Sequence, residues 1–132
     1  MTQNSTAGLP PDPYQMRVAH TQTYIIFSQY GREISSESLV RLCFEAQATI
    51  IEAIVVAKGD GPMPRLRPLW WYGDAQMKIN PGDEMTWLML SHTFTAIVSF
   101  VERYAAIAME IEILDITHGS VGWGVISHKG SS

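Results

Sequence analysis

The spacing of apolar residues along the chain constrains its fold more than any single motif. Residues 36–58 and 85–104 carry apolar side chains at steps of three and four, which is the spacing of amphipathic helices. Shorter segments with strand composition precede, separate and follow them, in the order strand, helix, strand, strand, helix, strand, strand. This order predicts an α+β fold in which one antiparallel sheet carries both helices on a single face. The other face is left for solvent, a ligand or a partner.

The first helix is predicted from Ser36 to Lys58. Ser35 and Ser36 are favourable N-terminal caps, and Gly59 ends the helix because glycine readily adopts a left-handed conformation. A second apolar row lies beside the main apolar face, so we expect this helix to be covered on more than one side. The second row consists of Val40, Phe44, Ile51 and Val55.

The second helix follows Asp83 or Thr86, either of which can cap it. Strands are predicted at residues 21–29, 69–72, 76–79, 109–114 and 121–127. Apolar and acidic residues alternate in the fourth of these strands, so its acidic side chains face away from the core. In the last strand Gly122 and Gly124 flank Trp123, and glycines on one face of a strand indicate that another group approaches closely there.

Without its last strand, the predicted order is that of the ferredoxin-like fold, βαββαβ. Right-handed crossovers then place the first and fourth strands side by side in the middle of the sheet, and the fifth strand extends one edge. The resulting two-layer sandwich forms one domain over residues 21–128. Residues 1–20, which are rich in proline and polar side chains, are predicted to be a flexible arm, and residues 129–132 a frayed tail.

Composition excludes several classes of protein. A hydrophobic content of 46% with 17% charged residues is typical of a globular domain, and a net charge of -4 with scattered basic residues argues against nucleic acid. No apolar run approaches the length of a membrane span, and no signal peptide is recognisable, which predicts a cytoplasmic protein with no membrane partner. Cys43 is the only cysteine, which excludes an internal disulfide, and its helical position predicts a small buried hydrophobe.

The open sheet face is the predicted binding surface. It collects aromatic, aliphatic and acidic side chains, and we expect Trp70, Trp71 and Tyr72 to stand at its rim. The predicted ligand-binding residues are Tyr24, Ile26, Trp70, Tyr72 and Trp123. Two interpretations remain open: an ordinary solvated surface, or an apolar floor that binds a ligand or forms a homodimer interface.

The available chemistry is acid and base catalysis without a cofactor. The histidines lack the spacing of zinc motifs, and neither a phosphate-binding loop nor a serine nucleophile elbow is present. Glu110 or Glu112, among apolar neighbours, and His118 in the adjoining turn are the candidate catalytic residues. His92 lies on the polar side of its helix and is predicted to face solvent.

Four short segments together resemble a loosely defined group of small fungal α+β proteins of unknown function. They are Tyr30-Gly31-Arg32-Glu33-Ile34, Gly59-Asp60-Gly61-Pro62, Glu84-Met85-Thr86-Trp87 and Gly119-Ser120-Val121-Gly122-Trp123-Gly124. The resemblance implies a shared order of strands and helices and supplies no catalytic residue. Many members of the group look secreted and end the glycine-rich segment with histidine, where this chain has Trp123.

Two functions follow as hypotheses. The first is binding of an apolar small molecule on the open sheet face, with the chain acting as a cofactor-independent isomerase, cyclase or lyase of fungal secondary metabolism on a polyketide-like or terpenoid-like compound. The alternative is a non-enzymatic, effector-like or toxin-like module that binds another protein. A homodimer formed through the open sheet is compatible with either hypothesis.

Overall fold

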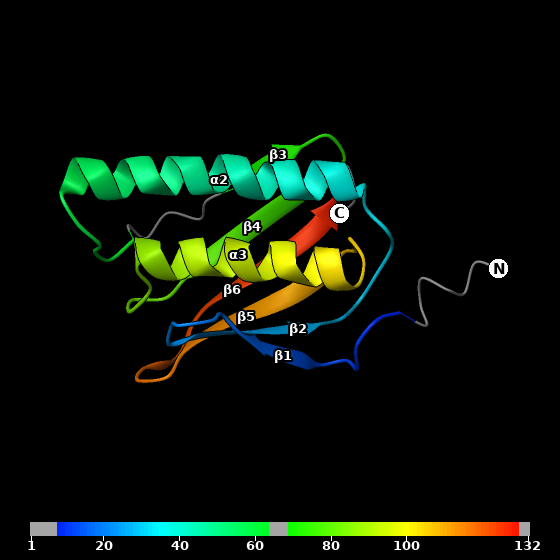
Figure 1. Cartoon of the computed structure of the whole chain (residues 1–132), viewed down its shortest axis with the longest axis horizontal. Coiled ribbons are helices and arrows are strands. Elements are labelled where there is room, and N and C mark those ends of the chain that lie inside the picture. Colours follow the sequence, from blue (N-terminus) through cyan, green and yellow to red (C-terminus); the bar gives the residue numbers. More distant parts are fainter. Residues whose placement is uncertain (1–7, 64–68, 130–132) are drawn as a thin grey trace.

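A six-stranded antiparallel sheet forms one layer of the molecule, and two helices lie side by side across one of its faces (Figure 1). The computed structural model describes residues 8–63 and 69–129. The helices are α2 (Ser36–Ala57) and α3 (Trp87–Arg103). The strands are β1 (Tyr14–Arg17), β2 (Thr23–Ser28), β3 (Leu69–Tyr72), β4 (Ala75–Pro81), β5 (Met109–Asp115) and β6 (Gly119–His128). The predicted α+β class and one-sided layering are confirmed.

The strand order across the sheet is β1-β2-β5-β6-β4-β3. Strand β2 pairs with β5 along its whole length, as the sequence predicts for the first and fourth predicted strands. The predicted place of the last strand is wrong, because β6 lies between β5 and β4 in the interior of the sheet. Residues 116–118 form a tight turn, and a connection this short keeps β6 beside β5. Strand β2 already pairs with one edge of β5, so β6 takes the other edge. Strand β6 therefore lies between β5 and β4.

Part of the predicted flexible arm is a strand. Residues 14–17 pair with β2, and Tyr14 and Met16 point toward the helix layer while Gln15 and Arg17 point away. The Tyr14 ring lies 5.6 Å from the Tyr104 ring, and the Tyr30 hydroxyl donates a hydrogen bond of 2.9 Å to the Pro11 carbonyl. Aromatic contact therefore orders this segment despite its prolines. Residues 1–7 and 130–132, like residues 64–68, lie outside the described residues.

The N-terminal caps of both helices are among those predicted. The Ser35 hydroxyl accepts a hydrogen bond of 3.2 Å from the Ser38 amide. At the other end of α2 the left-handed residue is Lys58, one position before the expected Gly59. Of the two candidate caps of α3, Thr86 is the N-cap, and its hydroxyl accepts a 3.2 Å hydrogen bond from the Met89 amide. Neither helix is long and apolar enough to cross a membrane within the described residues.

The core lies between the sheet and the helices. Strand alternation places one apolar set under the helices, and all of its members are fully buried: Ile25, Phe27, Met77, Ile79, Ile111 and Ile113. Phe27 meets Phe100 of α3 with ring centroids 4.6 Å apart. The predicted close approach at the last strand is confirmed, because a Cβ added to Gly124 would lie 2.8 Å from Cδ1 of Ile79. Cys43 is buried, as predicted.

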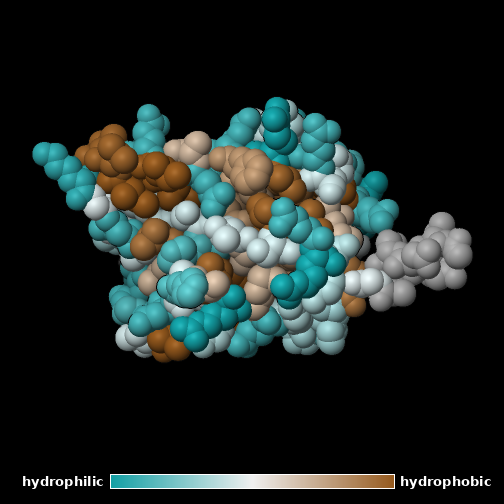
Figure 2. Space-filling model, in the orientation of Figure 1, coloured by the Kyte–Doolittle hydropathy of each residue, from teal (hydrophilic) through white to brown (hydrophobic). Residues whose placement is uncertain are grey.

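Three of the four residues of the second apolar row of α2 are exposed, contrary to expectation, and only Val40 is partly buried against the core. Phe44, Ile51 and Val55 keep 55%, 57% and 68% of their surface accessible. Figure 2 shows the hydrophobic side chains that gather over the C-terminal half of α2. The sheet and α3 cover only one sector of this helix, and no third element of the described chain packs on the opposite side. A row that the sequence assigns to the interior therefore faces outward.

Candidate functional site

The open sheet face brings five of the predicted residues together. The strand registers align Ile26 of β2 with Glu112 of β5 and then with Trp123 of β6, and they place Tyr24 and Glu110 on the same face. Trp123 is 50% exposed. Among the described residues, neither glutamate side chain forms a hydrogen bond or an ion pair. Glu110 also lines an open cleft of about 250 Å³ at one end of the face.

Trp70 and Tyr72 point to the helix layer, so the prediction that they border the open face is wrong. The Trp70 ring contacts Phe94 at 5.3 Å in an edge-on arrangement, and the Tyr72 hydroxyl accepts a 3.3 Å hydrogen bond from Nη2 of Arg41. Trp70 pairs with the buried Met77 across the β3–β4 ladder, and paired residues share a face. Of the three residues expected at the rim, only Trp71 lies on the open face.

His118 does not join the two glutamates of the open face. Its Nδ1 lies 3.1 Å from Oδ2 of Asp115, and its Nε2 lies 3.2 Å from Oε2 of Glu84. Asp115 is buried on the helix side of β5, whereas Glu112 lies three residues away and therefore on the opposite face. The structure thus assembles His118 with Asp115 and Glu84, and the expected pairing of His118 with Glu110 or Glu112 is not formed.

A cleft centred on His92 combines titratable and apolar side chains. It has a volume of about 360 Å³ and lies between the β1–β2 turn, the loop that follows α2, the beginning of α3 and the end of β5. We call it the His92 cleft. Its lining residues are His20, Thr21, Gln22, Thr23, Asp60, Thr86, Leu88, Met89, His92 and Asp115. Leu88 and Met89 supply an apolar wall, and the two aspartates supply negative charge.

His92 is held in the cleft by a hydrogen bond to strand β2. Its Nδ1 lies 3.0 Å from Oγ1 of Thr23, a residue that is 2% exposed. Burial lowers the pKa of His92 below its ordinary value of 6.5, and the charge of Asp60 opposes this shift. Asp60 is itself positioned, because its Oδ1 accepts a 2.9 Å hydrogen bond from the Leu88 amide. The prediction that His92 simply faces solvent is therefore wrong.

Asp115 forms a fixed wall of the same cleft. Its side chain is largely buried, and Oδ2 accepts a 3.0 Å hydrogen bond from the Thr117 amide in addition to its contact with His118. A carboxylate that is held by a backbone donor keeps its position when the cleft fills or empties. The His92 cleft is therefore preorganised on two sides, at Thr23 and at Asp115.

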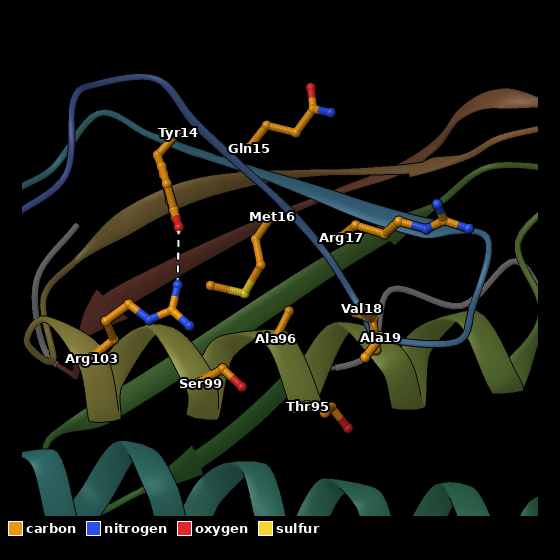
Figure 3. A pocket seen from close by; sticks show the side chains of 10 residues that line it. All are labelled: Tyr14, Gln15, Met16, Arg17, Val18, Ala19, Thr95, Ala96, Ser99 and Arg103. Carbon is orange, nitrogen blue, oxygen red and sulfur yellow. Dashed lines mark hydrogen bonds between the residues drawn. The ribbon is translucent and has the colours of Figure 1, made fainter.

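A larger groove runs between β1 and α3 (Figure 3). It has a volume of about 490 Å³, with Met16 and Ala96 inside and a polar end where Nη1 of Arg103 lies 3.5 Å from the Tyr14 hydroxyl. Figure 3 shows that these two side chains point toward each other across the groove. The titratable groups of the groove are tyrosine and arginine only, and their protonation does not change near neutral pH. The groove offers contact surface, whereas the His92 cleft also offers proton transfer.

The described residues contain no group of three or more His, Cys, Asp or Glu side chains arranged to hold a metal ion. Comparison of the chain with known protein families, curated proteins and solved structures gave no significant match. The resemblance to small fungal proteins therefore stays an expectation. The case for function depends on the residues of this chain alone.

Proposed function

We propose that the chain binds a small molecule in the His92 cleft and that His92 transfers protons to and from it. The ligand would combine an apolar part, which fits the wall formed by Leu88 and Met89, with a polar group that hydrogen-bonds to the imidazole. The volume of about 360 Å³ lies within the range of small-molecule sites. The observation that carries the proposal is the hydrogen bond of 3.0 Å between Thr23 and His92 inside a cleft with both apolar and acidic walls.

The partner of His92 suits a residue that must both accept and donate protons. A threonine hydroxyl can accept a hydrogen bond from a protonated Nδ1 or donate one to an unprotonated Nδ1. Thr23 therefore leaves Nε2 of His92 available to the ligand in either form. Nε2 is a base when it carries a lone pair and an acid when it carries a proton. Because burial lowers the pKa of His92, the neutral form dominates at pH 7 and the imidazole is ready to act as a base.

The reaction class that fits this arrangement is isomerisation. His92 would accept a proton from one atom of the ligand and return it to another, so that the protein ends in its starting protonation state and no oxidant or reductant is consumed. Asp60 and Asp115, at the edges of the cleft, would stabilise the imidazolium formed between the two transfers. This mechanism keeps the cofactor-independent acid and base chemistry expected from the sequence and assigns it to His92.

A second candidate function is protein binding through the open sheet face. Trp71 and Trp123 are 56% and 50% exposed on this face, and Val125 lies beside them with 42% of its surface accessible. Exposed tryptophan is enriched where proteins bind one another. This candidate does not use the His92 cleft, so the two functions predict ligand contacts at different residues.

The test is a fragment screen by two-dimensional NMR of the ¹⁵N-labelled chain. The probes are small aromatic and aliphatic ketones, alcohols and amides, each with one apolar part and one hydrogen-bonding group. We expect hits to shift the amide signals of Thr23, Asp60, Leu88 and His92, and we expect His92→Gln to weaken their binding. Trp123→Ala serves as the matched control and should leave the same shifts unchanged.

Two results would contradict the proposal. The first is a screen in which no probe shifts the cleft signals at millimolar concentration. The second is a set of hits whose shifts map to Tyr24, Ile26 and Trp123 and disappear in Trp123→Ala, because that pattern places the ligand on the open sheet face. For hits that pass, loss or exchange of a ligand C–H proton for deuterium, followed by NMR, tests the proton transfer directly, and His92→Gln should abolish it.

A further inference from the structure

The exposed row on α2 has a composition that fits a second copy of itself. The members from Glu37 to Val55 fall within an arc of about 80° of α2 at 3.6 residues per turn, and Lys58 follows the helix as its C-cap. Most of them face away from the core, whereas Val40 is partly buried at the border between the row and the core. From the N-terminal to the C-terminal end they are Glu37, Val40, Phe44, Ala48, Ile51, Val55 and Lys58. Four of the five central members are medium-sized or large apolar side chains, and the two ends carry opposite charges. We call this set the outer row of α2.

The outer row is symmetric about its own centre. Val40 and Val55 are equally far from the midpoint between residues 47 and 48, and so are Phe44 and Ile51. Glu37 and Lys58 are also equidistant from this midpoint. In an antiparallel pair of identical helices related by a two-fold axis, each position meets the equidistant position of the partner. Apolar side chains therefore meet apolar side chains, and each glutamate meets a lysine.

We propose that the chain forms a homodimer through an antiparallel contact between two outer rows of α2. Phe44 lies against the partner's Ile51, and Val40 lies against the partner's Val55. Glu37 pairs with the partner's Lys58 at both ends of the contact. A parallel arrangement would bring like charges together at each end, so the charges select the antiparallel one.

Three observations support a second copy as the occupant. Phe44, Ile51 and Val55 of α2 are each more than half exposed. Figure 2 shows hydrophobic surface over the C-terminal half of the same helix. Glu37 and Lys58 form no ion pair with any other described residue. Arg41, the basic residue one turn from Glu37, donates its hydrogen bond to Tyr72, and its charge acts on Glu37 without forming an ion pair. The charges at the ends of the row are thus available for a partner.

The test is the molar mass of the chain in solution, measured by sedimentation velocity across a wide concentration series. We expect the wild type to shift from monomer to dimer as its concentration rises. Phe44→Glu should raise the dimer Kd at least about a hundredfold, because it places two buried charges at the centre of the contact. Trp123→Glu, on the open sheet face, is the matched control and should leave the Kd unchanged. Circular dichroism checks that each variant folds.

Charge reversal makes the test specific for the antiparallel arrangement. Glu37→Lys and Lys58→Glu should each raise the Kd by roughly tenfold, since each creates two like-charge contacts per dimer. The double variant restores opposite charges and should return the Kd to the wild-type range. A chain that stays monomeric throughout, a dimer that is lost in Trp123→Glu, or a double variant as weak as the single variants would overturn the proposal.

Discussion

Replacing Gly124 with alanine tests how tightly β6 packs beneath the helices. Gly124 lies in the interior of the sheet, and the hydrogen in its side-chain position faces the core. An added Cβ would lie 2.8 Å from Cδ1 of Ile79 and 2.9 Å from Cγ1 of Ile111, where ordinary contact begins at 3.4 Å. These distances fall short of ordinary contact by 0.6 Å at Ile79 and by 0.5 Å at Ile111. Both isoleucines are fully buried, so they have little room to move by that amount. Overpacking of this kind costs about 1–3 kcal/mol.

The expected loss is measurable by urea unfolding and by calorimetry. A domain of this size has a stability of about 5–15 kcal/mol, so the unfolding midpoint should fall clearly while the m-value stays constant. The corresponding decrease in Tm is roughly 3–12 °C. Gly61→Ala is the control, because no atom lies within 4 Å of its added Cβ and its φ is not positive. That variant should be neutral or slightly stabilising.

A compensating substitution identifies the cause. Ile79→Val removes the Cδ1 atom that the new methyl group would meet, and alone it should cost about 0.5–1.5 kcal/mol. In the Gly124→Ala background the same change should cost less or increase stability. Two results would contradict the described packing of β6 against Ile79. The first is a Gly124→Ala variant as stable as Gly61→Ala, and the second is a double variant whose free-energy cost equals the sum of the costs of Gly124→Ala and Ile79→Val.

Three further predictions concern titratable groups. Burial raises the pKa of Cys43 to about 12, so Ellman's reagent at pH 8 should label this thiol only after unfolding, and rapid labelling of folded protein would contradict its buried position. Because the pKa of His92 is below 6.5 in the folded chain, its contribution to stability is present above pH 6.5 and is lost as the pH falls through and below that value. His92→Gln should therefore flatten the dependence of Tm on pH in this window, and an unchanged slope would show that His92 is not buried. Burial raises the pKa of Tyr30 to about 12, and Tyr30→Phe, which removes the hydrogen bond to Pro11, should cost about 0.5–1.5 kcal/mol and remove a step near pH 12 from an ultraviolet titration.

The elements that the sequence predicts well are those with a strong local signal. Alternation in β5 correctly separates Met109 and Ile111 from the glutamates between and beyond them, and serine and threonine caps correctly mark where α2 and α3 begin. The close approach at Gly122 and Gly124 was also readable, because a strand rarely carries two glycines on one face without a packing reason. Local chemistry determines these features, so a single sequence suffices.

Features that depend on contacts between residues far apart in the chain cannot be predicted from the sequence. The alternation in β1 covers only residues 14–17, and its order depends on Tyr104, far along the chain. The place of β6 follows from which edge of β5 is free. His92 is the clearest case, because the hydrogen bond that makes it a candidate joins residues 69 positions apart. The sequence showed a histidine on a polar helix side, and only the fold showed Thr23 opposite it.

The imidazole of His92 offers the most direct test of the proposed site. Long-range ¹H–¹⁵N NMR of the histidine side chains, recorded against pH, reports the pKa of each ring and the hydrogen bonding of Nδ1. We expect His92 to titrate below pH 6.5, and we expect its Nδ1 signal to move in Thr23→Val and to recover in Thr23→Ser. A His92 that titrates at or above pH 6.5, with an Nδ1 signal unaffected by Thr23→Val, would contradict the cleft as described.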